Sequence, residues 1–235
     1  MALSHRFFIT GTDTDCGKTL VTRGFMQLCR QRGMTTAGMK PVASGGMKDD
    51  HGILTNDDAL AIQSLCSTDT DYELINPFCY AHPIAPHLAA ELSGSKIELP
   101  TIHAAYNELA QHNECLIVEG VGGWRVPLNE ELDIGGLCQA LELPAVLVVG
   151  MKLGCINHAL LSAQAIIGDD VPLLGWVANC VDPAMQLVEQ NISTLRQHIP
   201  APLLGIVPFL PDRSPTLTSE KLTLPDSAFY KALPG

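Results

Sequence analysis

The chain has 235 residues, of which 46% are hydrophobic and 17% are charged. Such a composition is typical of a packed globular protein and excludes a largely disordered chain. The 14 basic residues are outnumbered by 25 acidic ones, and no segment concentrates Lys and Arg, so nucleic acid is a poor candidate partner. The length favours one α/β domain, which we expect to span residues 1–235.

The cysteines and the N-terminal stretch indicate the compartment. Eight cysteines stand singly in apolar runs, without a Cys-x-x-Cys pair or the spacing of a zinc site, which predicts free thiols in a reducing environment. The opening MALSHRFFITGTDTD has neither the basic n-region nor the long apolar h-region of a signal peptide. No apolar run reaches the ~18 residues of a membrane span. We therefore expect a cytoplasmic protein without a membrane partner.

Short apolar runs alternate with longer segments of helical periodicity, the pattern of strands buried on both faces by crossover helices. The predicted strands cover residues 6–11, 35–42, 114–120, 144–150, 173–179 and 203–208. The predicted helices cover residues 17–32, a segment beginning near Asn56, a short segment after Pro86, and residues 100–111, 132–141, 156–167 and 183–198. We expect one doubly wound α/β domain with six or seven mainly parallel strands, helices on both faces, and an irregular tail over residues 211–235 with at most a short helix.

The stretch GTDTDCGKT, residues 11–19, follows the first predicted strand and opens the first predicted helix, whose unpaired amides attract anions. It has five residues between its glycines where the common phosphate loop has four. Gly17 lets the backbone approach a phosphate, Lys18 can reach the β and γ phosphates, and the Thr19 hydroxyl can ligate Mg²⁺. The alternative is a chance glycine turn that opens a helix, which GKT directly after a strand disfavours.

Two carboxylates make this loop unusual, because Asp13 and Asp15 would repel phosphate unless they face a metal or a cationic group. They indicate a nearby amine or metal, and a solvated loop carboxylate remains the alternative for each. Cys16 lies near a helix N-terminus that would favour its thiolate, but it occupies a spacer position and needs no chemical role.

Lys40 lies near the C-terminal end of the second predicted strand within GMKPVASG, at the sheet edge where ligands of doubly wound folds bind. A lysine there can stabilise charge on a transferring phosphoryl group or a carboxylate; the alternative is a surface lysine at a strand end. Ser44, four residues later, is a weaker candidate for a hydroxyl contact to substrate.

Two carboxylates are candidate Mg²⁺ ligands, since magnesium takes one or two carboxylates besides phosphates. Asp58 opens a predicted helix, where capping by Asn56 or Asp57 is expected. Glu119 ends the buried run CLIVEG, where a carboxylate has few structural reasons to be, so metal binding or catalysis is favoured.

The segment GMKLGCINHA again leads from a strand through a glycine into a helix. The backbone amides of Gly154, Cys155, Ile156 and Asn157 could hold a carboxylate there. We interpret His158 as a structural helix residue and Cys155 as a small packed residue rather than a base and a nucleophile.

Together with GTDTDCGKT, the motifs AGMKPVASG, NDDAL, VEGVGGW, VVGMKLGCINHALL, GWVAN and PAPLLG resemble the dethiobiotin synthetases from the first strand to about Leu210. The resemblance implies a P-loop NTPase-like fold and an ATP-dependent ring closure in biotin synthesis. In that reaction 7,8-diaminononanoate, CO₂ and MgATP give dethiobiotin, ADP and phosphate through a carbamate and a carbamic-phosphoric anhydride.

The resemblance also implies residue roles and a homodimer. Lys18 and Lys40 would neutralise the carbamate and the transferring phosphoryl group, Thr19, Asp58 and Glu119 would hold Mg²⁺, and Thr14, Asp15 and Ser44 would face the diamine or its carbamate. The residues Gly154 to Asn157 would bind the substrate carboxylate across the dimer interface. The ATP site would comprise Asp15, Cys16, Gly17, Lys18, Thr19, Leu20, Asp58, Glu119, Gly120, Val121, Gly122, Asn179, Cys180, Pro208, Phe209 and Leu210, with Asn179 and the 208–210 turn at the adenine.

Some segments depart from the family. The segment PDRSPTLTSEKL after Leu210 matches no family pattern, and a family aromatic near the substrate carboxylate is replaced around Asn191.

A nucleotide-dependent switch protein is the rival from another class, but such proteins usually carry a second lysine just after the first loop glycine, where this chain has Thr12 and Asp13. An amidating synthetase related to the cobyrinate enzymes would need a glutaminase domain, for which 235 residues leave no room.

Overall fold

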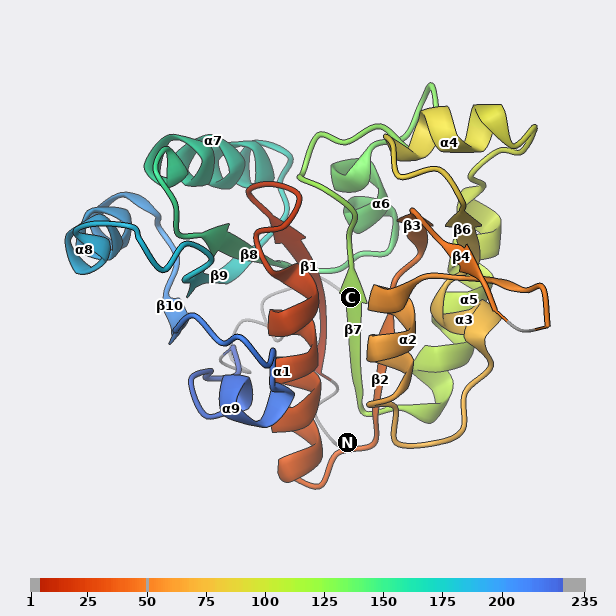
Figure 1. Cartoon of the computed structure of the whole chain (residues 1–235), viewed down its shortest axis with the longest axis horizontal. Coiled ribbons are helices and arrows are strands. Elements are labelled where there is room, and N and C mark those ends of the chain that lie inside the picture. The colour runs from red at the N-terminus through yellow and green to blue at the C-terminus, as the bar shows by residue number, and fades with distance from the viewer. Residues whose placement is uncertain (1–4, 50, 226–235) are drawn as a thin grey trace.

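The computed structural model describes residues 5–49 and 51–225, and its centre is a six-stranded sheet (Figure 1). The strand order is β10-β9-β8-β1-β7-β2, and every neighbouring pair is parallel. The strands are β1 (His5–Gly11), β2 (Thr36–Met39), β7 (Cys115–Glu119), β8 (Ala145–Gly150), β9 (Leu173–Asn179) and β10 (Leu203–Val207). The predicted doubly wound parallel sheet is confirmed.

The described part of the chain contains nine helices. They are α1 (Lys18–Gln31), α2 (Asp57–Gln63), α3 (Tyr72–Ile75), α4 (Pro86–Leu92), α5 (Leu99–His112), α6 (Ile134–Ala140), α7 (Cys155–Gly168), α8 (Val188–His198) and α9 (Pro215–Ser219). Helices α1, α2 and α9 pack together on one face (Figure 1). Because parallel crossovers are right-handed, α5, α6, α7 and α8, whose connections run the other way along the sheet, cover the opposite face.

The core explains the continuous apolar runs. Every residue of β7 and β8 is buried, since helices cover both faces of these central strands. Phe7 of β1 and Phe25 of α1 meet edge to face with ring centroids 5.4 Å apart, and Trp176 of β9 is fully buried. These contacts fix α1, and therefore the loop that precedes it, on the end of β1.

The prediction of one strand over residues 35–42 is wrong. The chain leaves the sheet after Met39, because Pro41 has no N–H to donate to a sheet ladder. The Lys40 amide instead donates to the Ile75 carbonyl (2.8 Å). A short strand β3 (Val42–Ser44) then pairs with β6 (Phe78–Tyr80), and β4 (Met47–Lys48) pairs with β5 (Leu54–Thr55).

Two segments near the C-terminal end refine the prediction. The helix expected over 183–198 begins only at Val188, because Leu187 adopts a left-handed backbone conformation (φ 54°) that interrupts it. The short helix expected after residue 210 is α9, which packs closely against α1. A Cβ at Gly24 of α1 would meet Thr218 and Leu222 side chains at 2.5 and 2.9 Å. The remainder of the predicted tail, residues 226–235, lies outside the described residues.

Across residues 5–49 and 51–225, none of the helices combines the length and the apolar character that crossing a bilayer requires.

Candidate functional site

The predicted site segments follow the carboxyl ends of the six parallel strands and therefore meet at one edge of the sheet. The loop 11–19 begins at the last residue of β1, and Lys40 follows β2. Glu119 is the last residue of β7 and leads into Gly120 to Gly122, and Gly154 to Asn157 come after β8. Strands β1 and β7 are neighbours whose connections lead to opposite halves of the sheet. The loop and Glu119 thus lie at the topological switch point, where doubly wound folds bind ligands.

The loop conformation depends on two glycines. Gly17 has φ 88° and precedes α1, and a Cβ there would collide with the side-chain amide of Asn179. A Cβ at Gly11 would collide with the Cys16 sulfur, which is buried under the loop. Among the described residues, none caps the α1 N-terminus through its side chain, so the first amides of α1 are available to an anion.

Lys18 lies folded over this loop. Its Nζ donates to the Asp13 carbonyl (2.9 Å) and lies 3.9 Å from the Cys16 sulfur. The side chain is largely buried, so its ammonium is held at the loop rather than in bulk water. The geometry places the charge where a phosphate seated on the α1 amides would meet it.

Lys40, Glu119 and Asp58 form a compact charge cluster, although they come from the ends of β2 and β7 and the start of α2. The Lys40 Nζ donates to Glu119 Oε1 (2.7 Å) and to Asp58 Oδ2 (2.8 Å). Burial alone would lower the pKa of Lys40, but the Glu119 and Asp58 carboxylates outweigh it and raise the pKa. Burial would likewise raise the pKa of Asp58, yet Lys40 lowers it. The ammonium and the Asp58 carboxylate therefore both stay charged at neutral pH.

Thr19 connects the phosphate loop to this cluster. Its hydroxyl donates to Glu119 Oε1 (2.8 Å), the oxygen that also accepts from Lys40. The other oxygen, Glu119 Oε2, is buried without a hydrogen-bond partner among the described residues. A buried carboxylate oxygen without a partner beside a threonine hydroxyl and a second carboxylate fits Mg²⁺, which prefers oxygen ligands.

No three His, Cys, Asp or Glu side chains in residues 5–49 and 51–225 gather into a metal cage.

The predicted substrate residues lie around this cluster. The Ser44 hydroxyl, at the end of β3, is buried and has no partner in the described chain, while its carbonyl accepts from the Asn56 amide (3.4 Å). Thr14 and Asp15 are exposed at the loop tip, where Asp15 has φ 59°. The Thr14 hydroxyl lies near Gly122.

The start of α7 presents backbone rather than side chains. Gly154 precedes the helix with φ 94°, and none of the described side chains caps the helix start. Cys155 is buried and burial raises the pKa of its thiol, as expected of a packed residue rather than a nucleophile. Ile156 is half-buried and Asn157 is exposed. The predicted carboxylate contact at these amides stays a prediction.

Asn179 is the last residue of β9, Cys180 follows it, and the 208–210 turn follows β10. The Asn179 side chain donates to the Cys16 carbonyl (2.9 Å), so it braces the phosphate loop from the side. The Cys180 amide donates to the Val207 carbonyl (2.9 Å), which brings both segments together, and Phe209 is exposed beside them. Their adenine contact stays a prediction.

Sequence reasoning missed one contact at the loop. Lys152 Nζ donates to Asp13 Oδ2 (2.8 Å), and the same carboxylate accepts the Thr14 amide through Oδ1 (2.8 Å). The hydrogen bond from Lys152 lowers the pKa of Asp13. Lys152 stands two residues after β8, much as Lys40 stands just after β2, and that repeated position is the signal that would have identified it.

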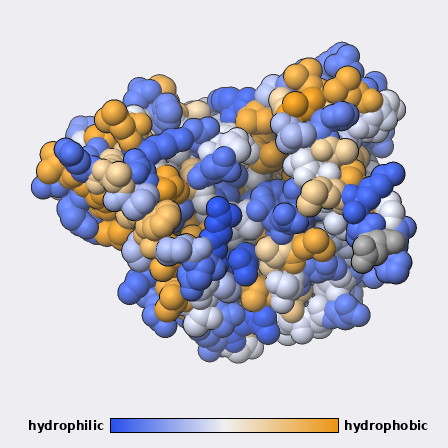
Figure 2. Space-filling model, in the orientation of Figure 1, coloured by the Kyte–Doolittle hydropathy of each residue, from blue (hydrophilic) through white to orange (hydrophobic). Residues whose placement is uncertain are grey.

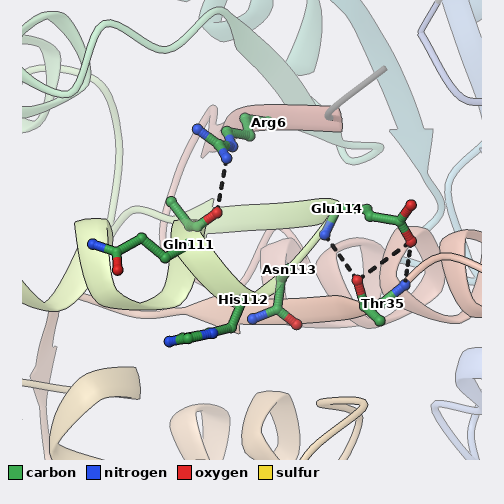
Figure 3. A pocket seen from close by; sticks show the side chains of 7 residues that line it. Arg6, Thr35, Gln111, His112, Asn113 and Glu114 are labelled. Carbon is green, nitrogen blue, oxygen red and sulfur yellow. Dashed lines mark hydrogen bonds between the residues drawn. The ribbon is translucent and has the colours of Figure 1, made fainter. Parts of the chain in front are cut away.

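A hollow of about 270 Å³ lies away from this edge (Figure 3). It is lined by residues at the amino ends of β1 and β7 and at the end of α5. Arg6 donates to the Ala110 carbonyl (2.8 Å) and Glu114 accepts from the Thr35 amide (3.0 Å), so its polar groups bond to one another. It contains none of the predicted site residues.

The phosphate loop between β1 and α1, at the switch point of a parallel sheet, defines a P-loop nucleotide-binding protein. A family model described as an AAA domain matches residues 5–216. Among solved structures, the chain is similar to the MinD cell division protein of Aquifex aeolicus in complex with MinC. That likeness has a TM-score of 0.53 at 11% identity, covers 92% of this chain and 86% of that one, and shows the fold alone.

Sequence relatives define the family. The chain is 49% identical over 219 residues to the ATP-dependent dethiobiotin synthetase BioD of Pseudomonas aeruginosa strain UCBPP-PA14, which covers 93% of this chain and 96% of that one. It is 47% identical over 238 residues to the protein of the same name from Chromohalobacter salexigens, covering 94% and 99%. The chain belongs to the ATP-dependent dethiobiotin synthetase family.

Proposed function

We propose that the edge formed by the loop 11–19 and the Lys40–Glu119–Asp58 cluster carries out the reaction of this family, the ATP-dependent closure of 7,8-diaminononanoate and CO₂ to dethiobiotin, ADP and phosphate. The observation that carries the proposal is the Glu119 carboxylate, which accepts from both Thr19 of the loop and Lys40. It joins a phosphate-binding element to a buried cation, and a carbamate and a γ-phosphate must meet between such groups.

The reaction needs charge neutralisation more than covalent catalysis. One amine adds to CO₂ and loses a proton, giving a carbamate. A carbamate oxygen then attacks the γ-phosphorus while the bond to the β–γ bridging oxygen breaks and ADP leaves. The second amine attacks the carbonyl carbon of the mixed anhydride, loses a proton and expels phosphate. Lys18 and Lys40 would stabilise the negative charge that gathers on both reacting groups in the transfer step.

Magnesium would be held by Thr19, Asp58 and Glu119 together with nucleotide phosphates. It would supply Lewis-acid stabilisation of the phosphoryl oxygens. The buried Glu119 Oε2 without a partner among the described residues supports this set.

The diamine would lie beside the loop tip. Thr14 and Asp15 are exposed there, and a carboxylate near a cationic diamine explains an acidic phosphate loop. The partnerless Ser44 hydroxyl would donate to the carbamate. Asn179, Cys180 and the 208–210 turn would contact adenine beyond the loop.

The substrate carboxylate would bind the α7 amides of a second copy in a homodimer. Leu153, directly before Gly154, is 97% exposed, and Leu161 of α7 is also exposed. Figure 2 shows a further group of apolar residues over α4, and Leu88 and Leu92 of this helix are exposed. The exposed side chains of Leu153 and Leu161, beside the proposed carboxylate site, support a partner there.

We place the protein in the cytoplasm, whose reducing conditions suit eight free thiols in the described chain.

Phosphate release by the purified protein tests this function. Release should require the diamine, bicarbonate and MgATP together, and dethiobiotin should form in equal amount. Phosphate release that is indifferent to the diamine would sink the assignment. Sedimentation of the active protein tests the dimer, because a fully active monomer contradicts a shared site.

A further inference from the structure

The backbone of Lys40 is held from outside the sheet. Strand β2 ends at Met39, so the ladder does not position Lys40. Its amide donates to the Ile75 carbonyl at the end of α3 (2.8 Å), and its carbonyl accepts the Asn76 side-chain amide (2.7 Å). The placement of this lysine therefore depends on α3 and the residue that follows it.

The same residues reach Asp58 through a chain of hydrogen bonds. The Tyr72 hydroxyl donates to Asn76 Oδ1 (2.8 Å) and accepts the Asn56 amide (2.8 Å). The Asn56 side chain in turn accepts the Asp58 amide (3.1 Å) and caps α2. With the Lys40–Asp58 ion pair (2.8 Å), these bonds form a closed circuit, which we call the Tyr72 network.

The Tyr72 network also reaches Ser44, because the Asn56 side-chain nitrogen donates to the Ser44 carbonyl (3.4 Å). Asn76 is almost fully buried and uses both ends of its amide, so a rotated Asn76 would leave buried polar groups unpaired. Burial raises the pKa of the Tyr72 hydroxyl, which keeps its proton for Asn76. The Tyr72 network therefore has its hydrogen bonds satisfied, and such networks hold their side chains in one arrangement.

We propose that Tyr72 and Asn76 are positioning residues for the reaction, and that they set the separation and direction of the Lys40 ammonium and the Asp58 carboxylate through the backbones of both. The inference rests on the proposed function. Misplacement of a reacting group by about 1 Å can lower a rate by about a hundredfold. Loss of the Tyr72 network should therefore reduce kcat, while ATP binding at the loop 11–19 persists.

The test variant is Tyr72→Phe, which removes the hydroxyl oxygen and keeps the aromatic ring that packs on the core. We expect kcat for diamine-dependent phosphate release to fall about tenfold or more, with the KM for ATP changed by less than about twofold. The matched control is Tyr106→Phe on α5, a buried tyrosine beside Arg6 at the opposite edge of the sheet. It should lose similar stability in urea unfolding and keep the wild-type kcat.

A double-mutant cycle tests whether the residues act as a unit. Asn76→Ala should lower kcat, and Tyr72→Phe should have little further effect in that background, because the hydrogen-bonded connection between the Lys40 backbone and Asn56 is already broken at Asn76. Additive losses, an unchanged kcat in Tyr72→Phe, or an equal loss in Tyr106→Phe would overturn the positioning role. A wild-type protein without diamine-dependent phosphate release would instead refute the proposed function, whatever the variants do.

Discussion

Two lysine–carboxylate pairs flank the phosphate loop, and they differ mainly in burial. The Lys40 and Glu119 side chains are 6% and 0% exposed, whereas those of Lys152 and Asp13 are 39% and 44% exposed. Removing one partner of a buried pair leaves an uncompensated charge and costs about 3–5 kcal/mol, while an exposed pair contributes about 0–1 kcal/mol. The comparison separates a fixed half of the site, around Lys40, from an adjustable half, around Lys152.

The largest effect is expected from Lys40→Ala. Turnover should nearly vanish, with kcat at least about a hundredfold lower, because the reacting groups lose a preorganised cation. The control is Lys48→Ala, since Lys48 is exposed on β4 outside the cluster. Circular dichroism should report a folded protein for both variants. An unaltered rate in Lys40→Ala would remove this residue from the charge-stabilising role.

Glu119→Gln probes the same half through the proposed Mg²⁺ site. The amide keeps the shape of the side chain but loses the negative charge, so the Mg²⁺ concentration for half-maximal activity should rise by at least about tenfold. Glu114→Gln is the matched control, because Glu114 bonds Thr35 at the other end of β7. An unchanged magnesium requirement in Glu119→Gln would argue against Glu119 as a ligand.

The ion pair between Arg125 and Asp169 provides a case of intermediate burial. Asp169 accepts from Arg125 (2.7 Å) and from the Trp124 indole (2.7 Å), and its side chain is 18% exposed. Burial would raise the pKa of Asp169, but these donors outweigh it and lower the pKa. Asp169→Asn should reduce the free energy of unfolding by about 1–3 kcal/mol at pH 7, between the values for the other two pairs.

The pH dependence of this difference has a definite sign. A carboxylate with a lowered pKa contributes stability above its ordinary pKa of 3.8, and the contribution is lost as the pH falls through the lower folded value. The gap between wild type and Asp169→Asn in urea unfolding should be constant from about pH 5 to 8 and close below 3.8. A gap that does not narrow at all as the pH falls below 3.8 would show that Asp169 acts by packing rather than charge.

The sequence allowed the sheet edge to be predicted because strand ends are local features. Glycine loops, apolar runs and a glutamate after a buried run each fall within a few residues, and parallel topology then places them together. The break after Met39 was also readable from Pro41, and the prediction of a strand over 35–42 underweighted that proline.

Contacts between distant side chains were not predictable in this way. Lys40 and Glu119 are 79 residues apart, and Lys152 and Asp13 are 139 apart. Which oxygen a lysine reaches depends on side-chain conformations and packing that no local pattern contains. The sequence therefore identified Lys40 and Glu119 as candidates without indicating that they touch, and it left Lys152 unnoticed.

The smallest effect is expected at the exposed pair, and it is the one that decides the comparison. Lys40→Met and Lys152→Met make the same chemical change at the two sites. Lys152→Met should alter the free energy of unfolding by no more than about 1 kcal/mol, and that difference should shrink in 1 M NaCl because salt screens exposed charges. Lys40→Met should lower it by about 3–5 kcal/mol at either salt concentration. Equal losses at the two sites would mean that burial does not distinguish them and that Lys152 belongs to the fixed half.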